Sequence, residues 1–74
     1  MDRAFLERHL DLAERHVVRG EDQVKRQRGI LAKLRNTGAD TTEAEKLLAN
    51  IEQTHRMQVA DRDRLRRELR LSRG

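Results

Sequence analysis

The stretch KLRNTGADTTEAEKLL, residues 33–48, decides the fold because it carries the signals that end one helix and begin another. Lys33 and Arg35 are cations placed for the last turn of a helix, where the helix dipole favours them. Gly38 suits the left-handed conformation that commonly follows a helix C-terminus. The first half of the stretch therefore predicts that a helix ends near Asn36.

The second half of the stretch predicts the start of a new helix. Asp40, Thr41 and Thr42 are all good N-cap residues. Asp40 with Glu43, and Thr42 with Glu45, have the spacing of a capping box. Because only about four residues separate the two helices, the connection forces them to run antiparallel as neighbours.

Before this turn, a helical seam repeats at alternating steps of four and three residues, which is the heptad spacing of a coiled coil. Its members are Leu6, Leu10, Ala13, Val17, Gly20, Val24, Gln27, Leu31 and Leu34. Gly20 and Gly29 each cost about 1 kcal/mol relative to alanine in a helix, so a break at residues 19–22 is the alternative. Since the repeat passes through Gly20 without a change of phase, one helix over about residues 2–36 is the preferred interpretation.

After the turn, residues 37–40, the same spacing continues to the end of the chain. It runs through Ala44, Leu48, Ile51, His55, Gln58, Arg62, Leu65 and Leu69. We expect a second helix over about residues 41–70 and a frayed tail over residues 71–74. The chain is thus predicted to be all-α, a single antiparallel two-helix hairpin of the coiled-coil type. The apolar residues of both repeats form the predicted interaction seam.

Composition allows one domain, residues 1–74, with a thin core. Hydrophobic residues make up 35% and charged residues 41% of the chain, with one Phe and no Trp, Tyr or Cys. The absence of Cys excludes a disulfide, a thiolate nucleophile and a Cys-based zinc site. The N-terminal region is too charged for a secretory signal, and no apolar run is long enough to span a membrane. We expect a cytoplasmic protein.

The order of the charges also favours a hairpin. Residues 23–39 carry five cations and no acid, and folding back places them beside Glu43, Glu45 and Glu52. The basic run over residues 62–73 lies beside acidic residues near the N-terminus, which are Glu7, Asp11 and Glu14. Opposite charges therefore meet at both ends of an antiparallel pair.

Some apolar residues are not absorbed by a contact between two helices. They are Phe5, Leu12, Ile30, Leu47, Met57 and Val59. A symmetric homodimer that forms a four-helix bundle buries such residues. We therefore expect two copies of the hairpin to pair.

Polar residues interrupt the seam at Gln27, His55, Gln58 and Arg62, where they are expected to specify register. Gly20 is expected to match the bulk of Met57. His9 and His16 are seven residues apart, too far to bind one metal ion together, and no other metal or phosphate-loop motif is present. Ser72 is the one serine in the chain, and its place near the frayed C-terminal end makes it a poor candidate for a nucleophile. We expect no catalytic residue, no cofactor and no metal site, and hence no enzyme.

The most basic stretch is RDRLRRELRLSRG, residues 62–74. Arginine clusters of this kind bind phosphate backbones, but aromatic residues that stack on bases are missing. The preferred interpretation is a solvated, ion-paired face. The alternative is a nucleic-acid interface, for which the candidate phosphate contacts are Arg62, Arg64, Arg66, Arg67 and Arg70.

Three segments together resemble a group of short uncharacterised bacterial proteins: residues 9–34, the turn GADTTEAEKLL at residues 38–48, and VADRDRL at residues 59–65. The resemblance implies a bacterial helical hairpin and transfers no functional residue. In architecture alone, the predicted hairpin is similar to the plasmid-copy-control Rop proteins, whose hairpins dimerise and bind paired RNA loops. The sequence thus favours a non-catalytic protein-interaction module, with a small basic nucleic-acid-binding regulator as the alternative.

Overall fold

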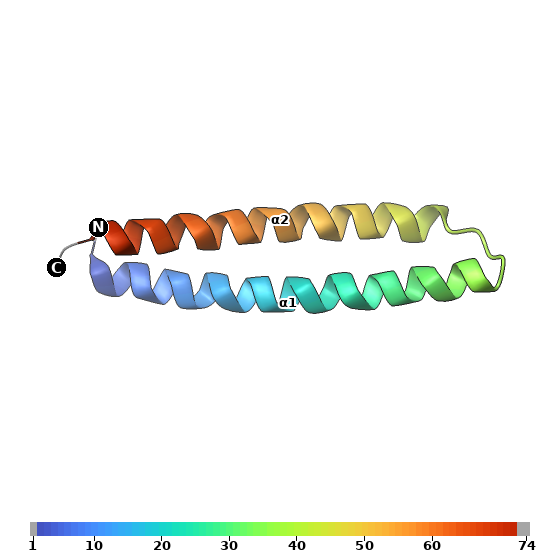
Figure 1. Ribbon diagram of the computed structural model, residues 1–74, viewed down its shortest axis with the longest axis horizontal. Helices are drawn as coiled ribbons and strands as arrows, with labels where there is room; N and C mark the ends of the chain where they lie inside the picture. The colour runs from blue at the N-terminus through green and yellow to red at the C-terminus, as the bar shows by residue number, and fades with distance from the viewer. Residues whose placement is uncertain (1, 73–74) are drawn as a thin grey trace.

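The computed structural model describes residues 2–72 and shows two long helices, α1 (Arg3–Asn36) and α2 (Thr42–Leu71). The helices run antiparallel, so the start of α1 and the end of α2 lie at one end of a rod and the connecting turn lies at the other (Figure 1). The rod measures 58 × 14 × 13 Å. The prediction of an all-α two-helix hairpin is confirmed. Residues 73–74 of the expected frayed tail lie outside the described residues, whereas Leu71 is the last residue of α2.

The C-terminus of α1 is closed by backbone hydrogen bonds around a left-handed glycine. Gly38 has a φ of 73°, as the sequence predicts for the residue after a helix end. Its N–H donates to the carbonyl oxygen of Arg35 at 3.2 Å, and the N–H of Ala39 donates to that of Leu34 at 3.1 Å. These two bonds form a Schellman motif, which satisfies carbonyl groups that the helix itself leaves without donors.

The N-terminus of α2 is capped by Asp40. Its carboxylate accepts hydrogen bonds from the backbone N–H of Thr42 at 3.0 Å and from the hydroxyl of Thr42 at 2.7 Å. These bonds, the backbone one first, lower the pKa of Asp40. Thr41 occupies the N-cap position but makes no side-chain capping bond. Of the three candidate caps, Asp40 is therefore the one whose side chain satisfies the helix terminus.

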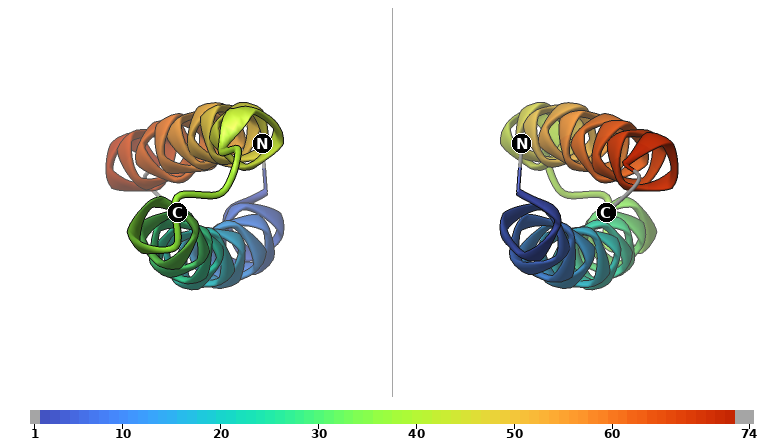
Figure 2. Two further views of the ribbon diagram at one scale, coloured as in Figure 1. Left: turned by 90° about the vertical axis from the view of Figure 1, so that its right-hand side faces the viewer. Right: turned by 90° about the vertical axis from the view of Figure 1, so that its left-hand side faces the viewer.

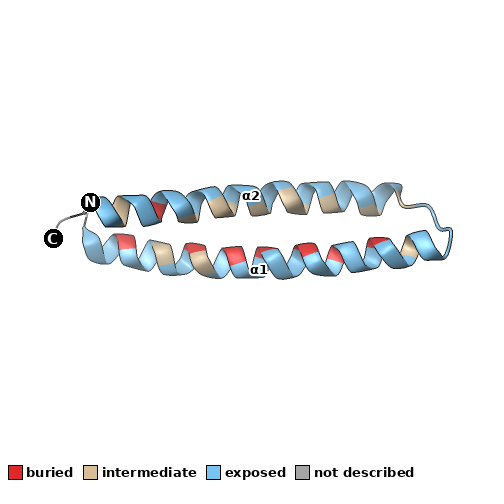
Figure 3. Cartoon of the chain, in the orientation of Figure 1, coloured by how far each residue is buried: buried red, intermediate tan, exposed pale blue. Residues whose placement is uncertain are grey.

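Buried residues follow the alternating spacing of the seam along α1 (Figure 3). They are Leu6, Ala13, Val17, Gly20, Val24, Gln27 and Leu31, whereas Leu65 is the one buried residue of α2. The remaining predicted seam residues of α2 are half-buried.

α1 is unbroken through Gly20, so the alternative of a break at residues 19–22 is wrong. Viewed from its ends, the molecule consists of two helices side by side, and no further helix or strand of residues 2–72 lies over the two edges where they meet (Figure 2). Over residues 2–72, neither helix contains a stretch with the length and apolarity that a membrane crossing requires. The candidate interaction surfaces of the hairpin are therefore its two edges and its open end.

Candidate interaction surfaces

The middle of the seam holds a polar layer built over Gly20. A Cβ atom at this position would lie 2.5 Å from Oε1 of Gln58 and 2.7 Å from Cδ2 of His55. Nε2 of His55 and Oε1 of Gln58 are both buried, and neither has a hydrogen-bond partner among the described residues. The expectation that Gly20 matches Met57 is wrong, since Met57 is 66% exposed and points away from the seam. The glycine instead makes room for the His55 and Gln58 side chains.

One edge of the hairpin carries ion pairs that join the two helices. Arg28 pairs with Glu52 at 2.8 Å, Arg35 with Glu45 at 3.2 Å, and Arg66 with Glu14 at 3.0 Å. We call this the ion-paired edge. The charge order of the sequence predicts pairing of this kind at both ends of the hairpin, and these contacts confirm it. Each exposed pair contributes only about 0–1 kcal/mol, so the pairs favour the antiparallel register more than they add stability.

Exposed apolar side chains gather on the opposite edge, which we call the open edge. They are Phe5, Leu12 and Ile30 on α1 and Leu47, Met57 and Leu71 on α2, with exposed fractions between 40% and 80%. None of the inter-helix ion pairs found within residues 2–72 lies on this edge. Val18 is also a large exposed apolar residue, but it lies on the side of the ion-paired edge.

The position of each residue relative to the seam shows which edge it occupies. Successive residues of a helix are rotated by about 100°, so the residue after a seam position and the residue before it point to opposite sides. The ion-pairing residues Glu14 and Glu52 follow the seam residues Ala13 and Ile51. The residues of the open edge precede seam residues, as Ile30 precedes Leu31, Leu47 precedes Leu48 and Met57 precedes Gln58. Ile30 and Leu47 line one shallow hollow there, so the two helices share this edge.

The two sides of the open edge differ in charge. On α1, the residues that precede seam positions include three cations, Arg19, Arg26 and Lys33. On α2, they include three acids, Glu43, Asp61 and Glu68, and one cation, Arg64. His9 and His16 also lie on the α1 side and are exposed, and the ring of His9 stacks on Phe5 with centroids 4.1 Å apart. The open edge is therefore basic along one helix and acidic along the other.

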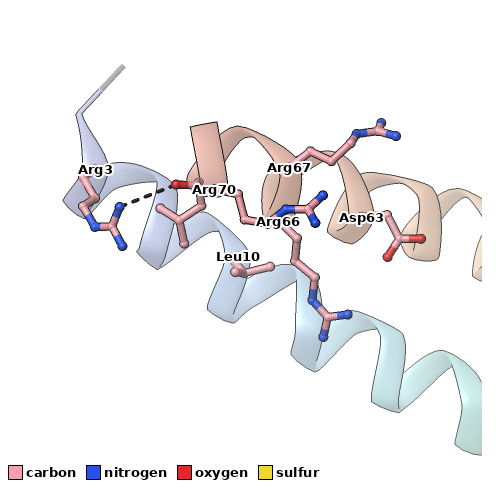
Figure 4. A pocket seen from close by; sticks show the side chains of 7 residues that line it. Arg3, Leu10, Asp63, Arg66, Arg67 and Arg70 are labelled. Carbon is pink, nitrogen blue, oxygen red and sulfur yellow. Dashed lines mark hydrogen bonds between the residues drawn. The ribbon is translucent and has the colours of Figure 1, made fainter. Parts of the chain in front are cut away.

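A basic hollow lies at the open end of the hairpin, where both helices contribute to it (Figure 4). We call it the arginine hollow, and it is lined by Arg3, Leu10, Asp63, Arg66, Arg67, Leu69 and Arg70. Arg3 donates from Nη1 to the carbonyl oxygen of Leu69 at 3.5 Å and pairs with Glu7 at 3.1 Å. Arg67 and Arg70 have no carboxylate within ion-pairing distance in the part of the chain that the structure describes.

The structure brings together only part of the predicted set of phosphate contacts. Arg66, Arg67 and Arg70 meet at the arginine hollow. Arg62 lies in the seam, where its side chain is 22% exposed and pairs with Asp63. Arg64 is on the open edge, held by Asp61 at 2.6 Å and Glu68 at 3.0 Å. The hydrogen bond that Arg64 donates to Asp61 and the charge of Glu68 raise the pKa of Arg64 further above its ordinary value.

Arg3 is the residue of the arginine hollow that sequence reasoning missed. The signal was available, because a hairpin whose turn is centred on Gly38 places the first turn of α1 beside the last turn of α2. Comparison of the chain with family models, with curated proteins and with solved structures found no match. Function is therefore inferred from the two edges and the arginine hollow.

Proposed function

We propose that the protein is a non-catalytic helical-hairpin interaction module that forms a homodimer through its open edge. The resulting four-helix bundle presents its outer helix faces to another protein. The observation that carries the proposal is the segregation of exposed side chains. Six large apolar residues occupy the open edge, while the ion pairs that join the helices occupy the other edge. A hairpin that acted alone would gain nothing from this separation.

The exposed area on the open edge is large enough to contribute to association. Full burial of a Leu, Ile, Phe or Met side chain is worth roughly 1.5–3 kcal/mol, so covering a half-exposed one is worth on the order of 1 kcal/mol. Six such residues on each copy oppose a cost of association estimated at about 4–15 kcal/mol. Clusters of exposed apolar residues typically mark interaction sites, and on this edge they lie near the turn, where Ile30 and Leu47 share a hollow, and at the open end.

The dimer is tested by sedimentation equilibrium with a matched pair of variants on α1. Ile30 is 50% exposed on the open edge, and Val18 is 64% exposed on the ion-paired side. Both become Glu, so the change of charge is the same. We expect wild-type protein and Val18→Glu to sediment as dimers at tens of micromolar, and Ile30→Glu to sediment as a folded monomer. A monomeric mass for the wild-type protein contradicts the proposal.

A second candidate function, nucleic-acid binding, is favoured by the arginine hollow. Arg67 and Arg70 project from α2 beside Arg3 and Arg66 of the same hollow, and no carboxylate among residues 2–72 pairs with either. Phosphate contacts of this kind make binding steeply dependent on salt.

The test of this second candidate is a salt titration of binding to generic duplex RNA and DNA. We expect the double variant Arg67→Gln, Arg70→Gln to bind more weakly and to lower the slope of log K against log salt by about 2. The control is Arg64→Gln, which removes an arginine already paired with Asp61 and Glu68. Absence of binding by the wild-type protein at low salt rules out this function.

A further inference from the structure

We propose that the two hairpins of the dimer lie side by side with their turns at the same end. Each α1 then packs against the α2 of the second copy, and the twofold axis runs parallel to the rod. This inference rests on the proposed dimer through the open edge and adds its geometry.

The register between α1 and α2 is constant along the rod. Arg28 is level with Glu52, and Arg35 is level with Glu45, one heptad closer to the turn. The Glu14 pair with Arg66 lies two heptads from Arg28 on the other side and keeps the same register. Residues one heptad apart on each helix therefore form successive levels on either edge.

On the open edge, Ile30 and Leu47 form the level nearest the turn, where they line one hollow. Steps of one heptad from this level give the other three, which are Gln23 with Thr54, His16 with Asp61, and His9 with Glu68. From the turn toward the open end, the levels of this edge thus change from apolar to neutral polar, and then to pairs of a histidine with an acidic residue. This order makes the two ways of pairing the hairpins chemically different.

With the turns at the same end, each level of one hairpin lies opposite the same level of the second hairpin. The Ile30 and Leu47 level forms an apolar layer of four side chains, and His16 meets the Asp61 of the second copy. With the turns at opposite ends, the apolar level instead meets His9 and Glu68. That pairing covers Glu68, together with the Arg64 that pairs with it, with aliphatic groups, which is costly because both charges lose contact with water.

The outer residues of the open edge favour the same arrangement. When α1 faces α2 of the second copy, the open-edge residues place Lys33 near Glu43 and Phe5 near Leu71 at the two ends of the rod. When the turns are at opposite ends, α1 of one copy faces α1 of the other. Arg19 then lies close to Arg19 of the second copy. Like charges placed opposite each other suppress an association. In the same register Arg19 faces Met57 and Leu12 faces Arg64, so the outer residues favour turns at the same end through the two ends of the rod and through the contact between like charges that this arrangement avoids.

A spin-label distance measurement distinguishes the two arrangements, and the absence of Cys allows single labelling. Ala39→Cys places the label in the exposed turn, and Asp22→Cys places it near the middle of α1 as a control. Helix axes in contact are about 8–10 Å apart, so turns at the same end give an Ala39 label distance within about 30 Å. Turns at opposite ends separate these labels by about the 58 Å length of the rod.

The mid-rod label at position 22 reports a measurable distance in either arrangement, and sedimentation of each labelled protein reports its mass. A dimer with a short distance between Ala39 labels supports the inference. A dimer with a distance near the rod length overturns the arrangement and leaves the proposed dimer intact. A monomeric mass, with no dipolar coupling at either position, overturns the proposed dimer itself.

Discussion

The polar layer over Gly20 predicts that replacing this glycine with alanine lowers stability relative to what helix propensity alone indicates. Glycine in a helix interior is less favourable than alanine by about 1 kcal/mol, so glycine-to-alanine substitutions in α1 are expected to stabilise unless the new methyl group clashes. A methyl group at Gly29 does not clash, because nothing lies within 4 Å of the position that an added Cβ atom would take. We expect Gly29→Ala to raise the free energy of unfolding by about 1 kcal/mol.

Gly20→Ala has the same gain in propensity and an opposing clash. The added Cβ lies 2.5 Å from Oε1 of Gln58, which is the end of a flexible side chain, and 2.7 Å from Cδ2 of the His55 ring. The Gln58 amide moves away at little cost, but the imidazole is rigid and has to shift as a whole. Overpacking of this kind costs about 1–3 kcal/mol. The two variants should therefore differ by about 1–3 kcal/mol, with Gly20→Ala the less stable.

Urea denaturation followed by far-ultraviolet circular dichroism measures this difference, at one protein concentration for all variants. The propensity term cancels between the two substitutions, so the difference reports the clash alone. His55→Ala in the Gly20→Ala background should recover most of the loss, since it removes the ring that the methyl group meets. Equal stabilisation by Gly20→Ala and Gly29→Ala would show that His55 does not close over the glycine, and would refute the reasoning.

Two further predictions concern the seam and the cap. Leu31 is 5% exposed, so Leu31→Asp buries a charge with no partner and should abolish the helical circular dichroism signal at room temperature, whereas a retained signal would place Leu31 outside the core. The capping hydrogen bonds from Thr42 lower the pKa of Asp40. A carboxylate with a lowered folded pKa stabilises the fold above its ordinary pKa and loses that contribution as pH falls through the lowered value. The wild-type protein should therefore lose more stability than Asp40→Ala between neutral and strongly acidic pH, and parallel pH profiles would contradict this role.

The hairpin itself follows from local signals that are strong in this chain. The alternating spacing from Leu6 to Leu34 specifies which face of α1 is covered, and the heptad phase correctly predicts a helix that continues through Gly20. Gly38 and Asp40 act as the sequence predicts, because helix termination and capping depend on a few adjacent residues. Fold class was therefore predictable without any knowledge of tertiary contacts.

The surfaces were less predictable, because they depend on rotation around each helix and on register between the two. Arg62, Arg64 and Arg66 form one run in the sequence, yet the rotation of about 100° per residue sends them to the seam, the open edge and the ion-paired edge. Met57 is one residue away from the seam position that faces Gly20, and that single step places it on the surface. A cluster in the sequence is therefore not a cluster in space.

The central claim is that the open edge is a contact between two copies of the hairpin. Isotope-filtered nuclear Overhauser measurements on a mixture of labelled and unlabelled protein test it most directly. We expect intermolecular contacts from the methyl groups of Ile30 and Leu47, and none from Val18. Intermolecular contacts confined to Val18 and the ion-paired edge, or none at all at tens of micromolar, would contradict the account.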